Sequence, residues 1–432
     1  MPASEPLRGR GAGNRPAAPA TAYSGAAKKL PLALLVFFSA LLYSQIQPPP
    51  PKVPGSPGGP PVTANRTKLR DGRHLAYLES GVPKEQAKYK IIFVHGFFCC
   101  RYDVLNVSQG LLQELGIYLL SFDRPGYCES DAHPARTEES IAVDIVELAD
   151  NLQLGPRFHL MGFSMGGEIM WSCLKHIPHR LAGVAILAPV GNYWWSGLPP
   201  DVYQEAWYVQ FRQDRAAVWV AHHLPWLANW WNTQRLFPSS SVKARNPAIY
   251  SKEDKPLTAK FAQRAHNKQV TQQGEHESLH RDMIVGFGKW GWSPLQPGNP
   301  FAGVGDDVKV HLWHGVEDVR TNLGISTEEK SSLREMESCV RQLKVEEEVA
   351  LRGEAAPTED LFVPVALSRH ISKRLPWVIY HELPTAGHLF PVADGMPDVI
   401  VKSRCSETGD DGLFRARARD GQLVGFRINS PF

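Results

Sequence analysis

Residues 158–175 constrain the fold of this chain more than any other segment. An apolar run (158–161) leads directly into Gly-Phe-Ser-Met-Gly-Gly (162–167), and a helical pattern follows at 169–175. A strand that turns this tightly into a helix needs small residues beside the central serine, because the helix and the strand pack closely. The turn lifts the hydroxyl of Ser164 clear of the sheet, at the positive end of the helix dipole. The segment therefore predicts a strand–turn–helix unit that presents Ser164 as a nucleophile.

The same alternation of strands and helices recurs along the chain. The predicted strands are 76–78, 90–94, 117–122, 158–161, 308–313 and 377–383, and helices are predicted at 140–152, 169–175 and 365–375. Several of these strands are continuous apolar runs, which is typical of strands buried on both faces of a parallel sheet. The pattern therefore predicts an α/β fold with a mostly parallel central sheet flanked by helices.

A serine nucleophile needs a base to take its proton and an acid to orient that base. After a strand–turn–helix serine, these partners follow in the order acid, then histidine. Asp318 comes shortly after the predicted strand 308–313, and His388 follows the last predicted strand in a Gly-His pair. The sequence therefore predicts a catalytic triad of Ser164, Asp318 and His388.

Five motifs together resemble the α/β-hydrolase fold superfamily. They are His95-Gly96, Asp123-Arg124-Pro125-Gly126-Tyr127, Gly162–Gly167, Gly315–Asp318 and Gly387-His388. The Pro-rich start and residues 68–73 are similar to the plant membrane-anchored branch of this superfamily. The resemblance covers residues 61–402. It implies an oxyanion hole formed by the backbone N–H groups of Phe97 and Met165, and a helical lid over the nucleophile.

The expected lid spans about 192–299, where the strand pattern stops. Nine of the twelve tryptophans lie in it. We expect their rings to line an apolar acyl pocket. The alternative is that they only attach the lid helices to the core.

The segment 319–360 departs from the family pattern, in which a Val-Pro and a helix follow the acid within a few residues. It is charged, it contains a capping box at Ser326, and it ends in Glu359-Asp360, a repeat of Glu317-Asp318. Asp360 is therefore an alternative triad acid. Asp318 is favoured because the end of its strand holds it directly. We expect the insert to form a surface helix, either as a regulatory arm or as an accidental insertion.

Two further departures concern Cys128 and the C-terminal tail. Cys128 stands where the family usually has a second glycine after Tyr127. Residues 403–432 form a polar, Gly-rich tail that is unlike a closing helix. Both features are expected to affect stability or activity without changing the chemistry, and the hydrolase domain is accordingly placed at 64–402.

The N-terminus differs in composition from the rest of the chain. Residues 1–29 are basic and lack a buried-face pattern, 30–47 contain an apolar run, and 48–63 are Pro-rich. We expect a disordered basic segment, a single-pass membrane anchor and a semi-rigid linker, respectively. A signal peptide and a transit peptide are the alternatives. Since basic flanks stay in the cytoplasm, the main domain is expected in the lumen of a secretory-pathway organelle such as the endoplasmic reticulum, or alternatively in a plastid.

Composition excludes several other classes of protein. Lys+Arg is 47 and Asp+Glu is 44, so the chain lacks the basic excess expected of a nucleic-acid binder. The six cysteines are scattered without a Cys-x-x-Cys motif, which indicates neither a zinc site nor a disulfide framework. No metal and no cofactor is therefore expected, and the sequence does not indicate an oligomeric state.

The expected function is that of a serine hydrolase, similar to an esterase or lipase, that acts on a carboxylic ester or related acyl substrate through an acyl-enzyme on Ser164. Epoxide hydrolases and dehalogenases of this fold need an aspartate at that position, so Ser164 argues against them. A non-catalytic ligand-binding or scaffold protein is one alternative. An acyltransferase is another, since an alcohol could replace water. The expected partners are the small-molecule or acyl-ester substrate and, through the anchor, a membrane.

Overall fold

The computed structural model describes residues 24–296, 298–302, 308–316, 363–405, 413–417 and 423–427. The chain separates into two units, residues 1–47 and 48–432. The first unit contains helix α1 (Ser24–Ile46), whose side chains are exposed from Lys29 to Gln45. Its stretch Lys29–Ile46 has a mean hydropathy of 1.6 and is long and apolar enough to cross a membrane. A membrane anchor and a signal sequence both meet this criterion.

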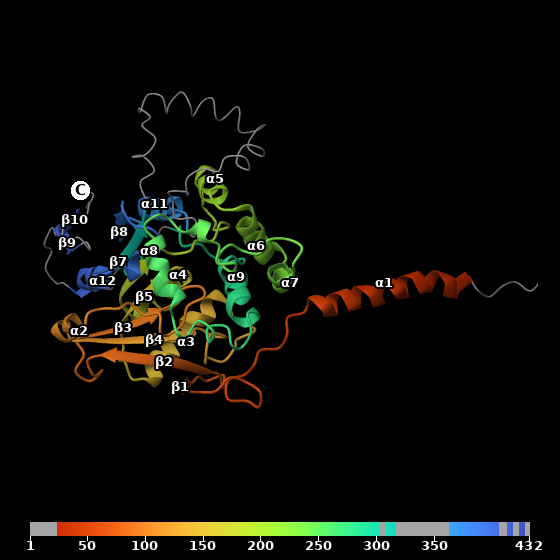
Figure 1. Cartoon of the computed structure of the whole chain (residues 1–432), viewed down its shortest axis with the longest axis horizontal. Coiled ribbons are helices and arrows are strands. Elements are labelled where there is room, and N and C mark those ends of the chain that lie inside the picture. Colours follow the sequence, from red (N-terminus) through yellow and green to blue (C-terminus); the bar gives the residue numbers. More distant parts are fainter. Residues whose placement is uncertain are drawn as a thin grey trace, which may run out of the picture. The chain divides into compact units, whose positions relative to one another are not determined.

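The second unit is built on an eight-stranded sheet (Figure 1). Its strands are β1 (Asn65–Lys68), β2 (His74–Gly81), β3 (Tyr89–Val94), β4 (Ile117–Phe122), β5 (Phe158–Phe163), β6 (Leu181–Leu187), β7 (Val310–Gly315) and β8 (Val378–Leu383). They lie in the order β1-β2-β4-β3-β5-β6-β7-β8. Strands β3 to β8 are parallel, whereas β1 and β2 pair antiparallel at one edge. The predicted mostly parallel sheet is confirmed.

Helices cover both faces of this sheet. They are α2 (Gln109–Leu115), α3 (Glu138–Asn151), α4 (Met165–His176), α11 (Val365–Arg374) and α12 (Met396–Cys405). Residues of α3, α4 and α11 pack in one core cluster, and residues of α2 and α12 pack in another. A two-stranded sheet of β9 (Leu413–Arg417) and β10 (Leu423–Arg427) follows in the tail.

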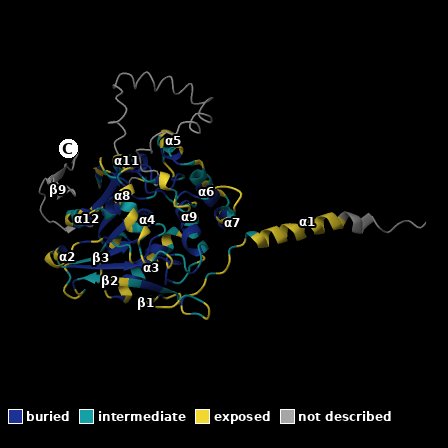
Figure 2. Ribbon diagram, viewed as in Figure 1, coloured by how far each residue is buried: buried dark blue, intermediate teal, exposed yellow. Residues whose placement is uncertain are grey.

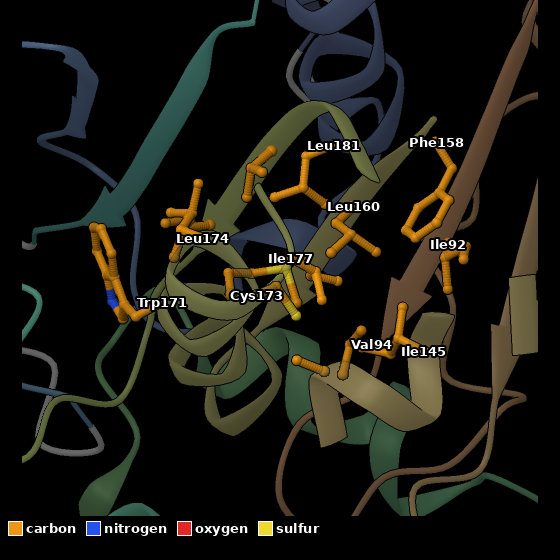
Figure 3. Close-up of a cluster of buried hydrophobic side chains, with 14 of the residues drawn as sticks. Ile92, Val94, Ile145, Phe158, Leu160, Trp171, Cys173, Leu174, Ile177 and Leu181 are labelled. Carbon is orange, nitrogen blue, oxygen red and sulfur yellow. The ribbon is translucent and has the colours of Figure 1, made fainter. Parts of the chain in front are cut away.

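The two core clusters divide each central strand between them. In β3, Ile92 and Val94 face the cluster that contains α3 and α4, whereas Ile91 and Phe93 face the other. Figure 3 shows Ile92, Val94 and neighbouring side chains of the first cluster converging between the sheet and the helices. In Figure 2 most residues of the central strands are buried. Burial on both faces is the physical reason for the unbroken apolar runs in the sequence.

The structure contains two strands of this sheet that the sequence pattern did not predict. Strand β6 reads Leu-Ala-Gly-Val-Ala-Ile-Leu, so small residues dilute its apolar signal although it lies between β5 and β7. Strand β1 reads Asn-Arg-Thr-Lys and is an edge strand without buried residues. Both strands form because they pair with neighbouring strands, and not because their own residues strongly favour β-structure.

Helical segments also fill the interval between β6 and β7. They are α5 (Pro200–Tyr208), α6 (Arg212–His223), α7 (Ala228–Thr233), α8 (Lys255–Ala262) and α9 (Arg281–Gly286), with short turns of 3-10 and π-helix among them. These helices occupy the predicted lid segment. Residues 319–360 lie outside the described residues, and so does the helix expected within them.

Candidate active site

Ser164 lies at the tight turn between β5 and α4. Its φ of 56° and ψ of −117° are strained for a residue with a side chain. Three backbone hydrogen bonds hold this conformation: the Ser164 N–H donates to the carbonyl of Leu187 (2.8 Å), and the N–H groups of Glu168 and Val190 both donate to the carbonyl of Ser164 (3.1 Å each). The turn therefore presents the hydroxyl at the N-terminus of α4, as the sequence predicts.

Two glycines make this turn sterically possible. A Cβ on Gly162 would lie 2.2 Å from the carbonyl oxygen of Gly166, and a Cβ on Gly166 would lie 2.1 Å from the carbonyl oxygen of Val94. Both distances are far shorter than a van der Waals contact. The glycines of the motif are thus needed for the close approach of α4 to β3 and β5, and not for a positive φ.

His388 faces Ser164 across the carboxyl edge of the sheet. The distance between His388 Nε2 and Ser164 Oγ is 3.2 Å, so the hydroxyl can donate to an imidazole that carries its proton on Nδ1. The two residues are 3% and 7% exposed, respectively. The ring of Phe163 packs against the imidazole with centroids 5.1 Å apart. The structure thus brings together the predicted nucleophile and the predicted base in a shielded place.

The two candidate acids, Asp318 and Asp360, lie outside the described residues. The described residues end at Val316 and begin again at Val363. The Val316 N–H donates to the carbonyl of Leu383 at the end of β8 (2.8 Å), so the chain leaves β7 close to the strand that precedes His388. The choice between the two acids stays a prediction.

The predicted oxyanion-hole residues flank the nucleophile. Met165 is the first residue of α4, and Phe97 is half-buried in the loop after β3. Both contribute to one apolar cluster, in which Met165 is buried and Phe97 packs against it. The structure therefore places both residues beside the turn between β5 and α4 that carries Ser164, which we call the elbow.

His95 and Arg124 brace the loop that contains Phe97. The Nδ1 of His95 bonds the carbonyl of Gly96 (2.9 Å), its Nε2 accepts from the backbone N–H of Arg124 (3.0 Å), and the Arg124 guanidinium donates to the same carbonyl (3.0 Å). Burial and then the charge of Arg124 lower the pKa of His95 to about 3. His95 is therefore neutral, and its two ring nitrogens join the loop after β3 to the backbone of Arg124.

Asp282 anchors Arg124 in turn, and the sequence analysis missed it. Its carboxylate accepts hydrogen bonds from Arg124 (2.7 Å), Arg136 (2.7 Å) and the hydroxyl of Tyr127 (2.6 Å). Burial raises the pKa of Asp282, but the two arginines outweigh burial and the net pKa is lowered. This buried network joins the segment near α9 to the loop after β4. No local motif marks Asp282, so only the packing reveals it.

Asp254 is a second residue that the sequence analysis missed. It lies at the start of α8, is 1% exposed, and accepts hydrogen bonds from the backbone N–H groups of His388 (3.0 Å) and Leu389 (2.7 Å). These partners are more than 130 residues away along the chain, and no sequence pattern links them.

Eight of the nine tryptophans of the predicted lid segment divide into three groups, and the ninth, Trp230, is half-buried beside Trp231, with ring centroids 6.4 Å apart. Trp207 is buried in the apolar cluster of Met165, and Trp194 and Trp231 pack against that cluster. A second group, Trp195, Trp290 and Trp292, packs in or against the core cluster of α3 and α4. The third group, Trp219 and Trp226, is exposed. The first group therefore packs with Met165, the residue that follows Ser164.

Two overlapping groups of side chains have the spacing of metal ligands. They are Cys100, Asp123 and Cys128, and Cys100, Asp103 and His266. An arginine already pairs with each carboxylate, Arg101 with Asp123 and Arg264 with Asp103. The pKa of Cys100 is raised above its ordinary value, chiefly by burial, so its thiol stays protonated, whereas a metal needs the thiolate. In this cluster the two carboxylates are therefore held in ion pairs with arginines, and the Cys100 thiol keeps its proton.

Cys128 itself has a backbone conformation that suits glycine. Its φ is 41°, in the left-handed region, and its side chain is completely buried. A residue with a Cβ costs about 1–2 kcal/mol in that region. The departure from the family glycine at this position therefore introduces backbone strain.

Comparison with known proteins agrees with this architecture. Residues 89–278 match the family model described as alpha/beta hydrolase fold, and the mostly parallel eight-stranded sheet flanked by helices has that fold. No curated protein matches the sequence. The membrane-anchored branch is not part of the match and stays a prediction.

Solved structures with a similar fold include two esterases and a putative peroxidase. The esterase EaEST from Exiguobacterium antarcticum is 15% identical, with 80% of this chain and 100% of that chain covered and a TM-score of 0.47. The esterase RhEst1 from Rhodococcus sp. ECU1013 is 14% identical, with 81% and 100% covered and a TM-score of 0.48. The putative non-heme bromoperoxidase BpoC from Mycobacterium tuberculosis H37Rv is 14% identical, with 79% and 96% covered and a TM-score of 0.46.

Proposed function

We propose that this protein is a serine hydrolase that cleaves a carboxylic ester or a related acyl substrate through an acyl-enzyme on Ser164. One observation carries the proposal: the Ser164 hydroxyl, on a strained turn at the start of α4, lies 3.2 Å from His388 Nε2. A neutral imidazole at this distance is a base that can take the hydroxyl proton.

The proposed reaction has two halves. His388 takes the proton of Ser164 as the serine oxygen attacks the substrate carbonyl, and the imidazolium then donates that proton to the leaving alcohol. Water repeats the sequence on the acyl-enzyme and releases the acid. The backbone N–H groups of Phe97 and Met165 would stabilise the oxyanion, each donor by about 2.7–4 kcal/mol of barrier. Asp318, or alternatively Asp360, would orient the imidazolium.

The surroundings of the elbow favour an apolar acyl group. Phe97 and Met165 belong to a cluster with Tyr193, Trp207 and Phe287, which the segment between β6 and β7 contributes. Tyr193 and Trp207 pack edge to face with centroids 5.0 Å apart. Such rings would wall the acyl chain and exclude water from the oxyanion.

We also propose that α1 is an uncleaved anchor that places the hydrolase unit in a secretory-pathway lumen, with a plastid as the alternative. The support is the length and hydropathy of Lys29–Ile46 together with the basic residues that precede it. A signal sequence remains the competing explanation of the same helix.

A fluorophosphonate probe, which phosphonylates an activated serine with loss of fluoride, tests the enzyme proposal. The wild type is expected to be labelled, whereas Ser164→Ala is not. Ser172→Ala is the matched control, because Ser172 is a buried serine on α4, the helix that follows Ser164, and its hydroxyl donates to the carbonyl of Glu138 (2.5 Å). If the folded wild type is labelled no better than Ser164→Ala, the non-catalytic alternative is favoured.

A second measurement separates hydrolysis from acyl transfer. Product analysis with an ester substrate, with and without an added alcohol, is expected to yield the free acid in both cases. A new ester as the main product would favour the acyltransferase.

A further inference from the structure

We infer that Asp254 is a positioning residue for His388, through which the predicted lid holds the catalytic base in place. The inference rests on the proposed serine-hydrolase function. Asp254 is not expected to touch the substrate, since its contacts are with the backbone of the histidine loop.

The Asp254 carboxylate holds two successive peptide groups. Its Oδ2 accepts the N–H of His388 at 3.0 Å, and its Oδ1 accepts the N–H of Leu389 at 2.7 Å. Hydrogen bonds to an ionised acceptor are roughly twice as strong as neutral ones. Because both oxygens are used on adjacent residues, the carboxylate fixes the orientation of this piece of backbone, and therefore the direction in which the imidazole leaves it.

Close contact before the histidine supports the same arrangement. A Cβ on Gly387 would lie 2.2 Å from Ser251 Oγ and 2.5 Å from Asp254 Oδ1. The hydroxyl of Ser251 in turn accepts the N–H of Asp254 at 3.1 Å. Gly387 thus allows an approach that a larger residue would block, and Ser251 orients Asp254 itself.

Apolar packing holds the two segments together around these hydrogen bonds. Tyr250, Leu257 and Phe261 pack against the core cluster that contains Leu389 and Phe390. At the surface, Lys260 Nζ donates to the carbonyl of Val392 (3.1 Å) and pairs with Asp394 (2.7 Å). The segment 250–261 therefore docks along the whole loop that carries the base.

This docking matters because proton transfer depends on position. The His388 Nε2 must stay within hydrogen-bonding distance of Ser164 Oγ while the imidazole gains and loses a proton. A fixed negative charge beside the histidine also favours the imidazolium that forms in the transition state. Asp254→Asn removes that negative charge. It also replaces one acceptor oxygen with an N–H₂ donor, which cannot accept the backbone N–H that it faces. The variant should therefore slow the chemical step more than it weakens probe binding.

Asp214→Asn is the matched control. Asp214 lies in the same inserted segment, is half-buried, and accepts the backbone N–H of Ser241 (2.6 Å). Among the described residues, no hydrogen bond or ion pair joins Asp214 to the histidine loop. Loss of a lid carboxylate that accepts a backbone hydrogen bond should therefore affect both variants alike, whereas loss of positioning should affect only Asp254→Asn.

The experiment measures saturation kinetics of fluorophosphonate labelling, together with the melting temperature, for the full-length wild type and both variants. For Asp254→Asn we expect the maximal labelling rate to fall about 10- to 100-fold with the probe's half-saturating concentration unchanged. For Asp214→Asn we expect a maximal rate within twofold of wild type. Equal maximal rates for the two variants would overturn the inference and leave the proposed function intact.

Two further outcomes bear on the inference. If Asp254→Asn does not fold, Lys260→Met tests the same docking from the surface: a fall of about 3-fold in the maximal rate at unchanged melting temperature supports the inference, and an unchanged rate contradicts it. If the wild type itself is not labelled, the proposed function fails and the positioning role fails with it.

Discussion

The hydroxyl oxygen of Ser164 lies 3.2 Å from Nε2 of His388, although 224 residues separate the two in sequence. Ser164 follows β5 and His388 follows β8, and these strands are parallel members of one sheet. Because the carboxyl ends of parallel strands meet at one edge, residues that follow them converge there. This relationship supports the proposed nucleophile and base, and the following predictions start from it.

Gly166→Ala should destabilise the protein. The added Cβ would lie 2.1 Å from the carbonyl of Val94, and backbone cannot move aside cheaply. We expect a loss of about 3 kcal/mol or more in the free energy of unfolding, measured by urea titration. Gly110→Ala in α2 is the control, because nothing lies within 4 Å of its Cβ; it should stabilise by about 0.5–1 kcal/mol. Equal urea midpoints for the wild type and Gly166→Ala would contradict the steric argument.

His95→Gln should slow labelling of Ser164. Glutamine cannot reproduce the geometry in which His95 bonds the Gly96 carbonyl and accepts from Arg124, so the loop that carries Phe97 should shift. We expect the maximal fluorophosphonate labelling rate to fall about 10-fold, because oxyanion stabilisation is sensitive to donor position. The exposed His179→Gln should leave the rate unchanged. A rate for His95→Gln equal to that of His179→Gln would exclude the bracing role.

Asp318→Asn and Asp360→Asn should separate the two candidate acids. Asparagine cannot stabilise the imidazolium, so replacing the true acid should lower ester turnover about 10⁴-fold. We expect that loss for Asp318→Asn and turnover close to wild type for Asp360→Asn. The reverse result would assign the role to Asp360, and two active variants would remove both residues from the mechanism.

Protein stability should decrease above neutral pH because of His266. Hydrogen bonds with Asp103 and then Cys100 raise the pKa of His266 to about 9. A histidine with a raised folded-state pKa stabilises fully below its unfolded pKa of about 6.5, and this contribution is lost as the pH rises through about 9. Since the group is partly exposed, solvent screening reduces the contribution to about 1 kcal/mol.

Urea unfolding of wild type and His266→Gln at pH 6.5 and pH 9.5 measures this effect. The free energy of unfolding of the wild type should fall by about 1 kcal/mol more than that of the variant. Parallel falls in the two proteins would show that His266 does not carry the pH dependence.

Helix α1 should retain the full chain in membranes after carbonate extraction, because its exposed apolar surface favours the bilayer. A chain that begins at residue 48 contains the whole second unit and should be released into the supernatant. Release of the uncleaved full-length chain would reject the anchor, and an N-terminus beyond α1 on the mature protein would identify a signal sequence.

Local sequence determined the parts of this protein whose signal lies within a few residues. The apolar run of β4 predicted its bounds, 117–122, because burial on both faces demands such a run. The glycines around Ser164 predicted the elbow, since only small residues permit the contact between α4 and the sheet. The order of strand ends in the sequence was sufficient to predict that His388 pairs with Ser164.

Tertiary structure decided the features that depend on contacts between distant segments. Asp254 and Asp282 have no sequence signature, because each carboxylate can join two segments only when packing brings backbone or arginine donors to it. Cys100 and Cys128 likewise look scattered until the ends of β3 and β4 bring them together. Strand β6, diluted by glycine and alanine, forms because β5 and β7 pair with it. Local pattern thus defines the elements and the nucleophile, whereas long-range packing supplies the groups that hold the site in place.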